Sequence, residues 1–235
     1  MTVSFTRHGL RHGMRRSWPL AVGSFAYGIG FGAMADQAGL AWSEAVAMSA
    51  LVYAGAAQIV ALGIWSDPIP LLAVWLGVFA VNARYVLLGA TLRPWLAGLA
   101  AHRSYATLGL ISDGTWAMAL RERTAGRDDA AFLVGSGLAL WVAWVSSTGV
   151  GHALGAVVGE PRRLGLDFLL PAFCAVMAVA LWRGRRDAAP VLAGAGAAAL
   201  VAHLAAGPWH VVAGVLAGGA IAAVRAPNGS GTHGA

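Results

Sequence analysis

Arg84 lies inside the long apolar stretch 71–92, close in sequence to the polar residues Asn82 and Tyr85. A guanidinium does not lose its proton in proteins, so Arg84 stays charged wherever its side chain lies. Inside a bilayer core a charge costs about 2.5–3.5 kcal/mol by insertion scales unless it is paired or hydrated. Arg84 therefore points to a site for a polar group, although at about 6 Å from the midplane its side chain could also extend to the membrane surface.

Asp113 offers the opposite charge from the middle of another apolar segment, 105–120. A carboxylate isolated in such a place either holds a proton or finds a cation. We expect Asp113 and Arg84 to lie near each other. They would form a static ion pair, or a site in which Arg84 binds a substrate carboxylate while Asp113 exchanges a proton or binds a substrate ammonium.

Further polar side chains lie in the apolar segment around residues 48–58. Ser49 and Tyr53 are four residues apart and would share one helical face, with Gln58 on a neighbouring face. An unpaired amide in hydrocarbon is costly, so Gln58 needs partners. It would either join two helices by hydrogen bonds or line a polar path, and the sequence supports both interpretations equally.

Three alternate glycines, Gly28, Gly30 and Gly32, lie in the first apolar segment. Glycines weaken a helix, so this pattern is consistent with a local break whose freed backbone groups face a polar cavity, as in transporters with broken helices. The spacing of four between Gly28 and Gly32 equally suits close packing of two helices.

These residues must be positioned by membrane-spanning helices. The chain is 58% hydrophobic and 11% charged, with a mean hydropathy of +0.68, whereas soluble domains carry about 25% charged residues. Long apolar runs between short charged clusters indicate an all-α, polytopic membrane protein. We predict eight spans, some of them short or broken, at roughly 17–35, 44–65, 69–92, 105–120, 130–158, 166–182, 188–206 and 208–225. Seven spans remain possible, because only Gly207 and Pro208 separate the last two.

The predicted organisation is a basic cytoplasmic arm over residues 1–16, a single transmembrane domain over 17–225 and a disordered tail over 226–235. All 16 basic residues are arginine. With the N-terminus inside, eleven of them fall in cytoplasmic segments, which by the positive-inside rule places both termini in the cytoplasm.

Other polar and aromatic residues are assigned structural roles. Carboxylates at predicted helix ends would complement helix dipoles, and buried histidines would pack with hydrogen bonds. Tryptophans at span ends would anchor the chain at the interface. The carboxylates are Asp36, Glu44 and Asp167, and the histidines are His152 and His203. The tryptophans are Trp18, Trp65, Trp95, Trp182 and Trp209. No enzyme motif, metal-ligand pattern or cofactor motif occurs in the sequence, so we expect no catalysis.

The order of these motifs resembles the AzlC family, the large subunits of branched-chain amino acid exporters. The resemblance covers about residues 17–180 and rests on Gly30-Phe31-Gly32, Met48-Ser49, Tyr53-Ala54-Gly55-Ala56-Ala57-Gln58, Asn82-x-Arg84, Asp113 and Gly165-Leu166-Asp167-Phe168. One position departs from the family pattern: the family usually has Asp-Glu in the fourth span, and this chain has Asp113-Gly114.

The resemblance implies an inner-membrane permease that works with a small membrane subunit of the AzlD type. We therefore expect a secondary exporter of apolar amino acids, driven by a proton gradient, whose binding residues are Arg84, Asn82, Asp113, Tyr53, Gln58 and Gly30. The competing hypothesis is a passive channel or structural membrane subunit in which Arg84 and Asp113 form a static lock.

Overall fold

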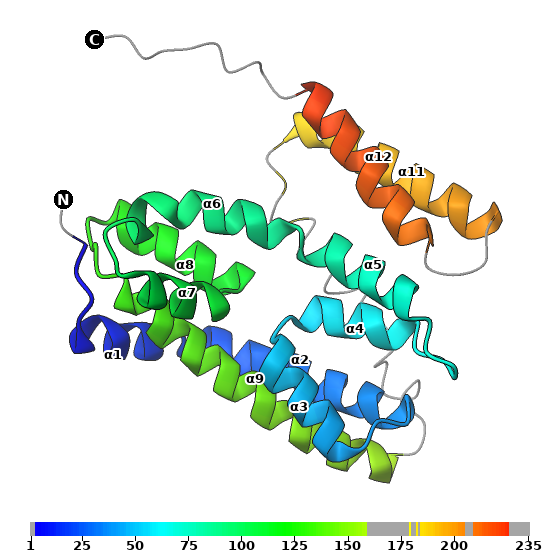
Figure 1. The fold of residues 1–235 in the computed structure, drawn as a ribbon, viewed down its shortest axis with the longest axis horizontal. Helices are drawn as coiled ribbons and strands as arrows, with labels where there is room; N and C mark the ends of the chain where they lie inside the picture. Colours follow the sequence, from blue (N-terminus) through cyan, green and yellow to red (C-terminus); the bar gives the residue numbers. More distant parts are fainter. Residues whose placement is uncertain (1–2, 159–178, 180–181, 183, 205–208, 226–235) are drawn as a thin grey trace. The chain divides into compact units, whose positions relative to one another are not determined.

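A computed structural model describes residues 3–158, 179, 182, 184–204 and 209–225 (Figure 1). Within these ranges the regular secondary structure is helical, apart from an isolated bridge between Ser4 and Asp129, which confirms the predicted all-α class. In the part of the chain that the structure describes, three helical stretches are long and apolar enough to cross a membrane: Leu71–Arg93, Ala131–Gly155 and Arg185–Leu204. The predictions for Asp167, for nearly all of the span 166–182 and for the tail 226–235 fall outside the described residues.

The chain divides into two compact units. Of the described residues, the first unit comprises 3–63 and 81–158, and the second comprises 64–80, 179, 182, 184–204 and 209–225. The first unit contains α1 (Arg7–Arg16), α2 (Trp18–Gln37), α3 (Trp42–Val52), α4 (Gly55–Gly63), α6 (Arg84–Leu96), α7 (Ala101–Gly109), α8 (Asp113–Thr124) and α9 (Ala131–Val158). Most of α5 (Leu71–Asn82) belongs to the second unit, with η3 (Arg185–Asp187), α11 (Ala188–Leu204) and α12 (Trp209–Arg225).

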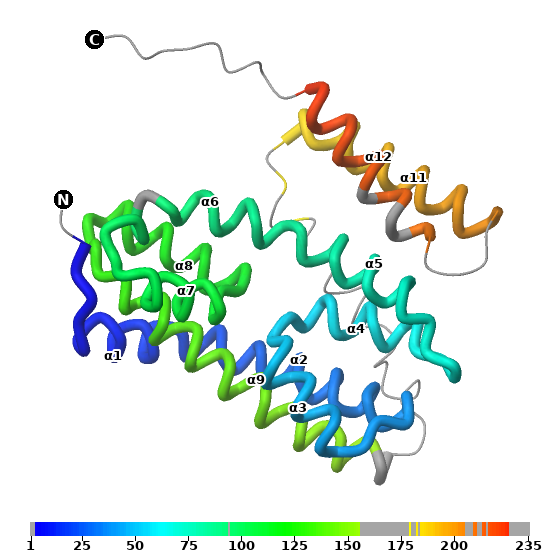
Figure 2. Tube along the Cα trace, in the orientation of Figure 1, coloured from blue at the N-terminus to red at the C-terminus, as the bar shows by residue number. Residues whose placement is uncertain are grey.

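In the second unit, α11 and α12 form a hairpin whose helices pack through small residues (Figure 2). A Cβ added at Gly194 would lie 2.9 Å from the carbonyl oxygen of Gly214, and one added at Gly218 would lie 3.1 Å from that of Pro190. Small residues at these positions let the two helix backbones approach closely.

In the first unit, α2 and α9 pack most closely, and their glycines explain why (Figures 1 and 2). A Cβ on Gly28 would collide with the Ser147 side chain, one on Gly32 with the backbone of Thr148, and one on Gly151 with that of Ile29. Small residues let two backbones approach in this way.

The structure of α2 shows that the helix break expected near Gly30 does not occur. The α2 helix is continuous from Trp18 to Gln37, so no break occurs at the glycines, and no backbone amides are freed near Gly30. Gly30 is buried within α2, and the packing interpretation of the glycine pattern is the correct one.

The predicted basic arm contains helix α1, which packs against α9 and is tied to the segment between α8 and α9. His12 Nε2 lies 3.1 Å from a carboxylate oxygen of Glu122, and Arg127 donates two hydrogen bonds of 2.6 and 3.0 Å to the same carboxylate. The Thr6 hydroxyl and backbone N–H donate to Asp129, which also accepts the N–H of Ala131.

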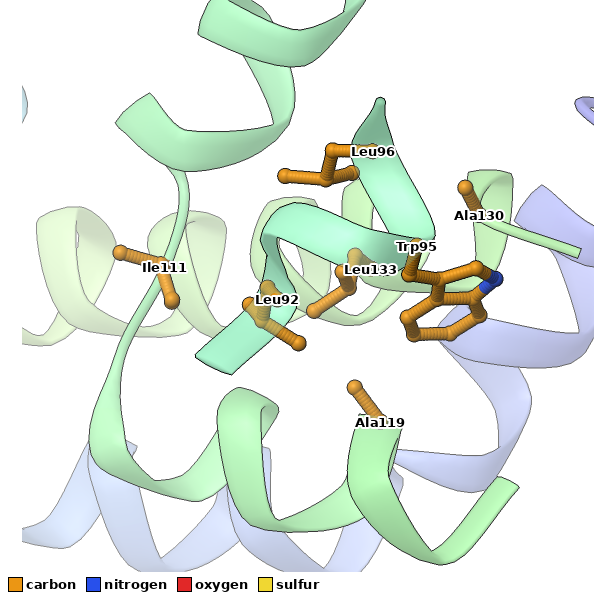
Figure 3. Packing of buried hydrophobic residues seen from close by; sticks show 7 residues of the cluster. All are labelled: Leu92, Trp95, Leu96, Ile111, Ala119, Ala130 and Leu133. Carbon is orange, nitrogen blue, oxygen red and sulfur yellow. The ribbon is translucent and has the colours of Figure 1, made fainter. Parts of the chain in front are cut away.

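Trp95 belongs to a buried hydrophobic cluster and is only 1% exposed (Figure 3). The cluster joins α6, α8 and α9 through Leu92, Trp95, Leu96, Ile111, Ala119, Ala130 and Leu133. The prediction that Trp95 anchors a span at the interface is therefore wrong, because position near a span end does not reveal which side of a helix faces other helices.

The glycine contacts predict that Gly32→Ala destabilises the protein while Gly23→Ala, in the same helix, does not. A Cβ at residue 32 meets backbone atoms that cannot move away, and overpacking of this kind costs about 1–3 kcal/mol. Nothing lies within 4 Å of a Cβ at residue 23, and alanine favours a helix by up to about 1 kcal/mol. Thermal unfolding in detergent measures both, and equal midpoints for the two variants would contradict the assignment.

The carboxylate that holds α1 should make stability depend on pH. Hydrogen bonding from Arg127 holds the pKa of Glu122 below its usual value, against the opposing effect of burial, and His12 adds to the lowering. Because the folded-state pKa is depressed, this contribution is present above about pH 4.5 and is lost as the pH falls through the lowered value. Glu122→Gln should cost about 1 kcal/mol at neutral pH and flatten the acid loss of stability.

Amide hydrogen exchange of α1 across this pH range measures the effect. Glu44→Gln is the matched control, because a glutamine oxygen can still accept the Ala41 N–H that Glu44 accepts at 2.8 Å. An unchanged pH profile in Glu122→Gln would show that this carboxylate does not hold the helix.

Candidate functional site

The predicted span 44–65 is interrupted at Tyr53 and Ala54, where α3 ends and α4 begins. Tyr53 adopts φ 44° and ψ 43°, the left-handed region that residues other than glycine rarely occupy. Its N–H still bonds to the Ser49 carbonyl at 3.2 Å, so α3 ends with its last turn closed.

The predicted span 105–120 is also interrupted, between Gly109 and Asp113. Ser112 caps α8: its Oγ accepts the Thr115 N–H at 3.3 Å, and Thr115 Oγ1 accepts the Ser112 N–H at 2.8 Å. This reciprocal pair is a capping box. Asp113 is therefore the first residue of α8, where a carboxylate complements the positive end of the helix dipole.

Both interruptions lie against the same part of α9, at Gly137. The Tyr53 hydroxyl donates to the Gly137 carbonyl at 3.4 Å, and a Cβ on Gly137 would lie 2.5 Å from the Leu110 carbonyl oxygen. Ser112 and Tyr85 lie within interaction range of the Tyr53 hydroxyl. The two helix breaks thus face one small region of the first unit.

The ion pair lies at this region. Arg84 begins α6 after a one-residue interruption at Ala83, and its Nη2 lies 3.0 Å from Oδ2 of Asp113. This confirms that the two charges lie together. Their side chains are 30% and 25% exposed respectively, so both are accessible as well as paired. The guanidinium also lies 5.3 Å from the centre of the Tyr85 ring, within cation–π distance.

Two buried polar atoms in this part of the chain have no hydrogen-bond partner among the described residues: Nε of Arg84 and Oδ1 of Asn82. A buried group left unsatisfied costs about 1–3 kcal/mol. After pairing with Asp113, Arg84 therefore retains one buried N–H donor without a partner among the described residues. Among the described residues, no hydrogen bond or ion pair joins Asn82 to Arg84 or Asp113.

Gln58 belongs to a different, fully buried network. Its Nε2 donates to Ser49 Oγ at 3.2 Å, and its Oε1 accepts from Trp144 Nε1 at 3.0 Å. Ser49 Oγ is in turn 2.8 Å from Thr148 Oγ1. The Gln58 amide thus has partners on both sides, an arrangement that favours the helix-joining interpretation over lining of a path.

Predictions for the peripheral polar residues had mixed outcomes. Glu44 caps α3, and His152 packs with a hydrogen-bond distance of 2.8 Å to the Leu40 carbonyl, both as predicted. Asp36 is not a dipole-complementing cap, because it lies at the C-terminal end of α2. Its carboxylate lies 3.8 Å from His152 Nε2 instead.

Sequence reasoning identified the charges but missed two residues that organise the region. Gly137, against which both helix breaks pack, had no signal that distinguished it from the many other glycines. Trp144, which bonds to Gln58, looked like one more apolar residue of its span. The start of α8 did have a signal, because Ser112 and Thr115 have capping-box spacing.

Comparison with known proteins agrees with the resemblance. The family profile described as AzlC protein matches residues 19–158. The inner membrane protein YgaZ of Escherichia coli is 27% identical over 220 residues, covering 91% of this chain and 89% of its own length. An uncharacterized membrane protein of Archaeoglobus fulgidus is 28% identical over 196 residues, covering 83% and 84%. No solved structure matches.

The ion pair predicts that Asp113→Asn destabilises the protein by about 1–3 kcal/mol, because it leaves the Arg84 charge partly buried and unpaired. The double variant Arg84→Gln with Asp113→Asn should recover much of the loss, since no uncompensated charge remains. Asp67→Asn, an exposed loop carboxylate, is the control. Thermal unfolding of the wild type, both single variants, the double variant and the control tests the pairing, and strictly additive effects of the two single changes would exclude it.

Proposed function

Because the chain belongs to the AzlC family of membrane transport proteins, we propose that it exports branched-chain or similarly apolar amino acids across the cell inner membrane. The observation that carries this proposal is the accessible Arg84–Asp113 pair beside the interrupted helices. Broken helices near mid-membrane are where transporters bind polar substrates.

An amino acid zwitterion fits this pair because it carries both complementary charges. Its carboxylate would bind the exposed part of the Arg84 guanidinium, and its ammonium would bind Asp113. In the empty site the two side chains neutralise each other, and in the loaded site the substrate neutralises both. Neither state leaves a charge unpaired in the membrane, which keeps the free-energy difference between them small.

The surroundings of the pair support an apolar cargo. Partly buried aliphatic and aromatic side chains pack beside the cluster of Figure 3, among them Tyr85, Leu88, Leu108 and Trp116. An aliphatic substrate side chain can contact such surfaces. In this proposal Tyr53 and Asn82 line the polar path, Gln58 fixes the helices that bear it, and Gly30 acts only through packing.

Transport by this chain would also need an energy source, a partner subunit and a defined orientation in the membrane. The sequence has no nucleotide-binding loop, so an ion or substrate gradient would drive transport, and a proton is the proposed coupling ion. A small AzlD-type membrane subunit would complete the exporter. Both termini would lie in the cytoplasm, as the distribution of arginines favours.

The alternative function is a passive channel or structural subunit with a static charge lock. The direct 3.0 Å contact between Arg84 and Asp113 favours it, because a lock needs no substrate.

Transport of labelled leucine from loaded vesicles distinguishes the two functions. We expect efflux from vesicles that contain the chain and its small partner, and Arg84→Gln should reduce it about 30-fold or more, because losing one partner of a charge pair typically costs 2–5 kcal/mol. Arg93→Gln is the matched control, since Arg93 is exposed near the other end of the same helix. Equal leucine retention with and without the complex would refute the exporter.

The charge swap Arg84→Asp with Asp113→Arg then separates binding from locking. If folding recovers without transport, the pair contacts the substrate directly. If folding and transport recover together, the pair is a lock.

A further inference from the structure

A groove of about 1010 Å³ runs along the first unit, with α1 and α2 forming one wall and α9 the other. Its lining is apolar except at Arg15 and Ser146, and consists of Met14, Arg15, Trp18, Ala21, Val22, Phe25, Leu138, Ala139, Val142, Ala143 and Ser146. None of these residues belongs to the Arg84–Asp113 site.

Two close contacts at glycines lie on either side of the groove's lining residues. At one end Gly13 packs directly against Phe132 and Ser136 of α9, and at the other Gly28 packs against Ser147. The lining residues lie between these contacts on both walls. The groove therefore lies along only part of the contact that α1 and α2 make with α9.

The length of the groove corresponds to one leaflet. Residues 14 to 25 span roughly 16 Å at the rise of a helix, and half of a hydrocarbon core is about 15 Å. A membrane-spanning partner helix would need a face about twice as long. An acyl chain of a single leaflet matches the available length.

The charge at one end of the groove favours a lipid with an anionic headgroup. Arg15 is exposed, and among the described residues no carboxylate lies within salt-bridge distance of it. Trp18, which is 70% exposed, lines the same end, and tryptophan and arginine together are typical of the membrane interface. On the proposed orientation this end faces the anionic cytoplasmic leaflet.

We propose that this groove binds one acyl chain of an anionic phospholipid from the leaflet beside α1, with the lipid phosphate on Arg15. The apolar walls hold the chain, and the guanidinium selects the charged headgroup. The site is structural or modulatory and does not require the exporter function.

Native mass spectrometry of the full chain in detergent, titrated with dioleoyl phosphatidylglycerol, tests the site. Arg15→Gln should weaken binding about fivefold, since a basic residue near an anionic surface contributes about that factor. Arg16→Gln is the matched control, because it removes the same charge from the neighbouring position, which does not line the groove. Wild-type protein should prefer this lipid to dioleoyl phosphatidylcholine by a similar factor, and inorganic phosphate should not displace it.

Filling the groove tests the acyl-chain contact separately. Val142→Trp keeps Arg15 but occupies the depression, and should lower retention of both lipids. The proposal is overturned if Arg15→Gln and Arg16→Gln bind lipid equally, or if Val142→Trp binds like the wild type. Displacement of the lipid by a co-purified membrane subunit would also overturn it, by assigning the groove to a protein.

Discussion

A bilayer core contains no water to satisfy backbone groups, so a helix can be interrupted there only where other protein groups cover the freed N–H and C=O groups. This constraint explains the first unit. The ends at Tyr53 and Leu110 both pack against α9 at Gly137, and the start of α8 is closed by the Ser112–Thr115 box. The polar site exists because α9 provides a surface on which irregular backbone can be accommodated.

Helix α9 plays this role through two kinds of side chain. Its glycines admit the backbones of α1 and α2, while Trp144 and Thr148 bond to the buried polar groups of α3 and α4. Small residues give close contact and polar residues fix the register, and both depend on the long unbroken α9. Without it the broken helices would have no common support.

The sequence predicted the charged pair because charge inside an apolar segment must be neutralised, and only one carboxylate, Asp113, was available at depth. It predicted the helical class because composition and run length determine it. It did not distinguish packing from breaking at Gly28, Gly30 and Gly32, since both uses require the absence of a side chain. The sequence wrongly placed Trp95 at the membrane interface, because residues distant in sequence decide whether a tryptophan faces lipid or other helices.

Helix α8 holds a charge contact at each end. Asp113 at its first residue bonds to Arg84, and Glu122 near its last turn bonds to His12 of α1 and to Arg127. The two carboxylates are nine residues apart, or roughly 13 Å along a rigid helix. A movement of α8 that opens the Arg84 contact must therefore also change the geometry at Glu122. Substrate binding as proposed at one end and docking of the N-terminal helix at the other would then be reciprocally linked, each altering the equilibrium of the other by the same free energy.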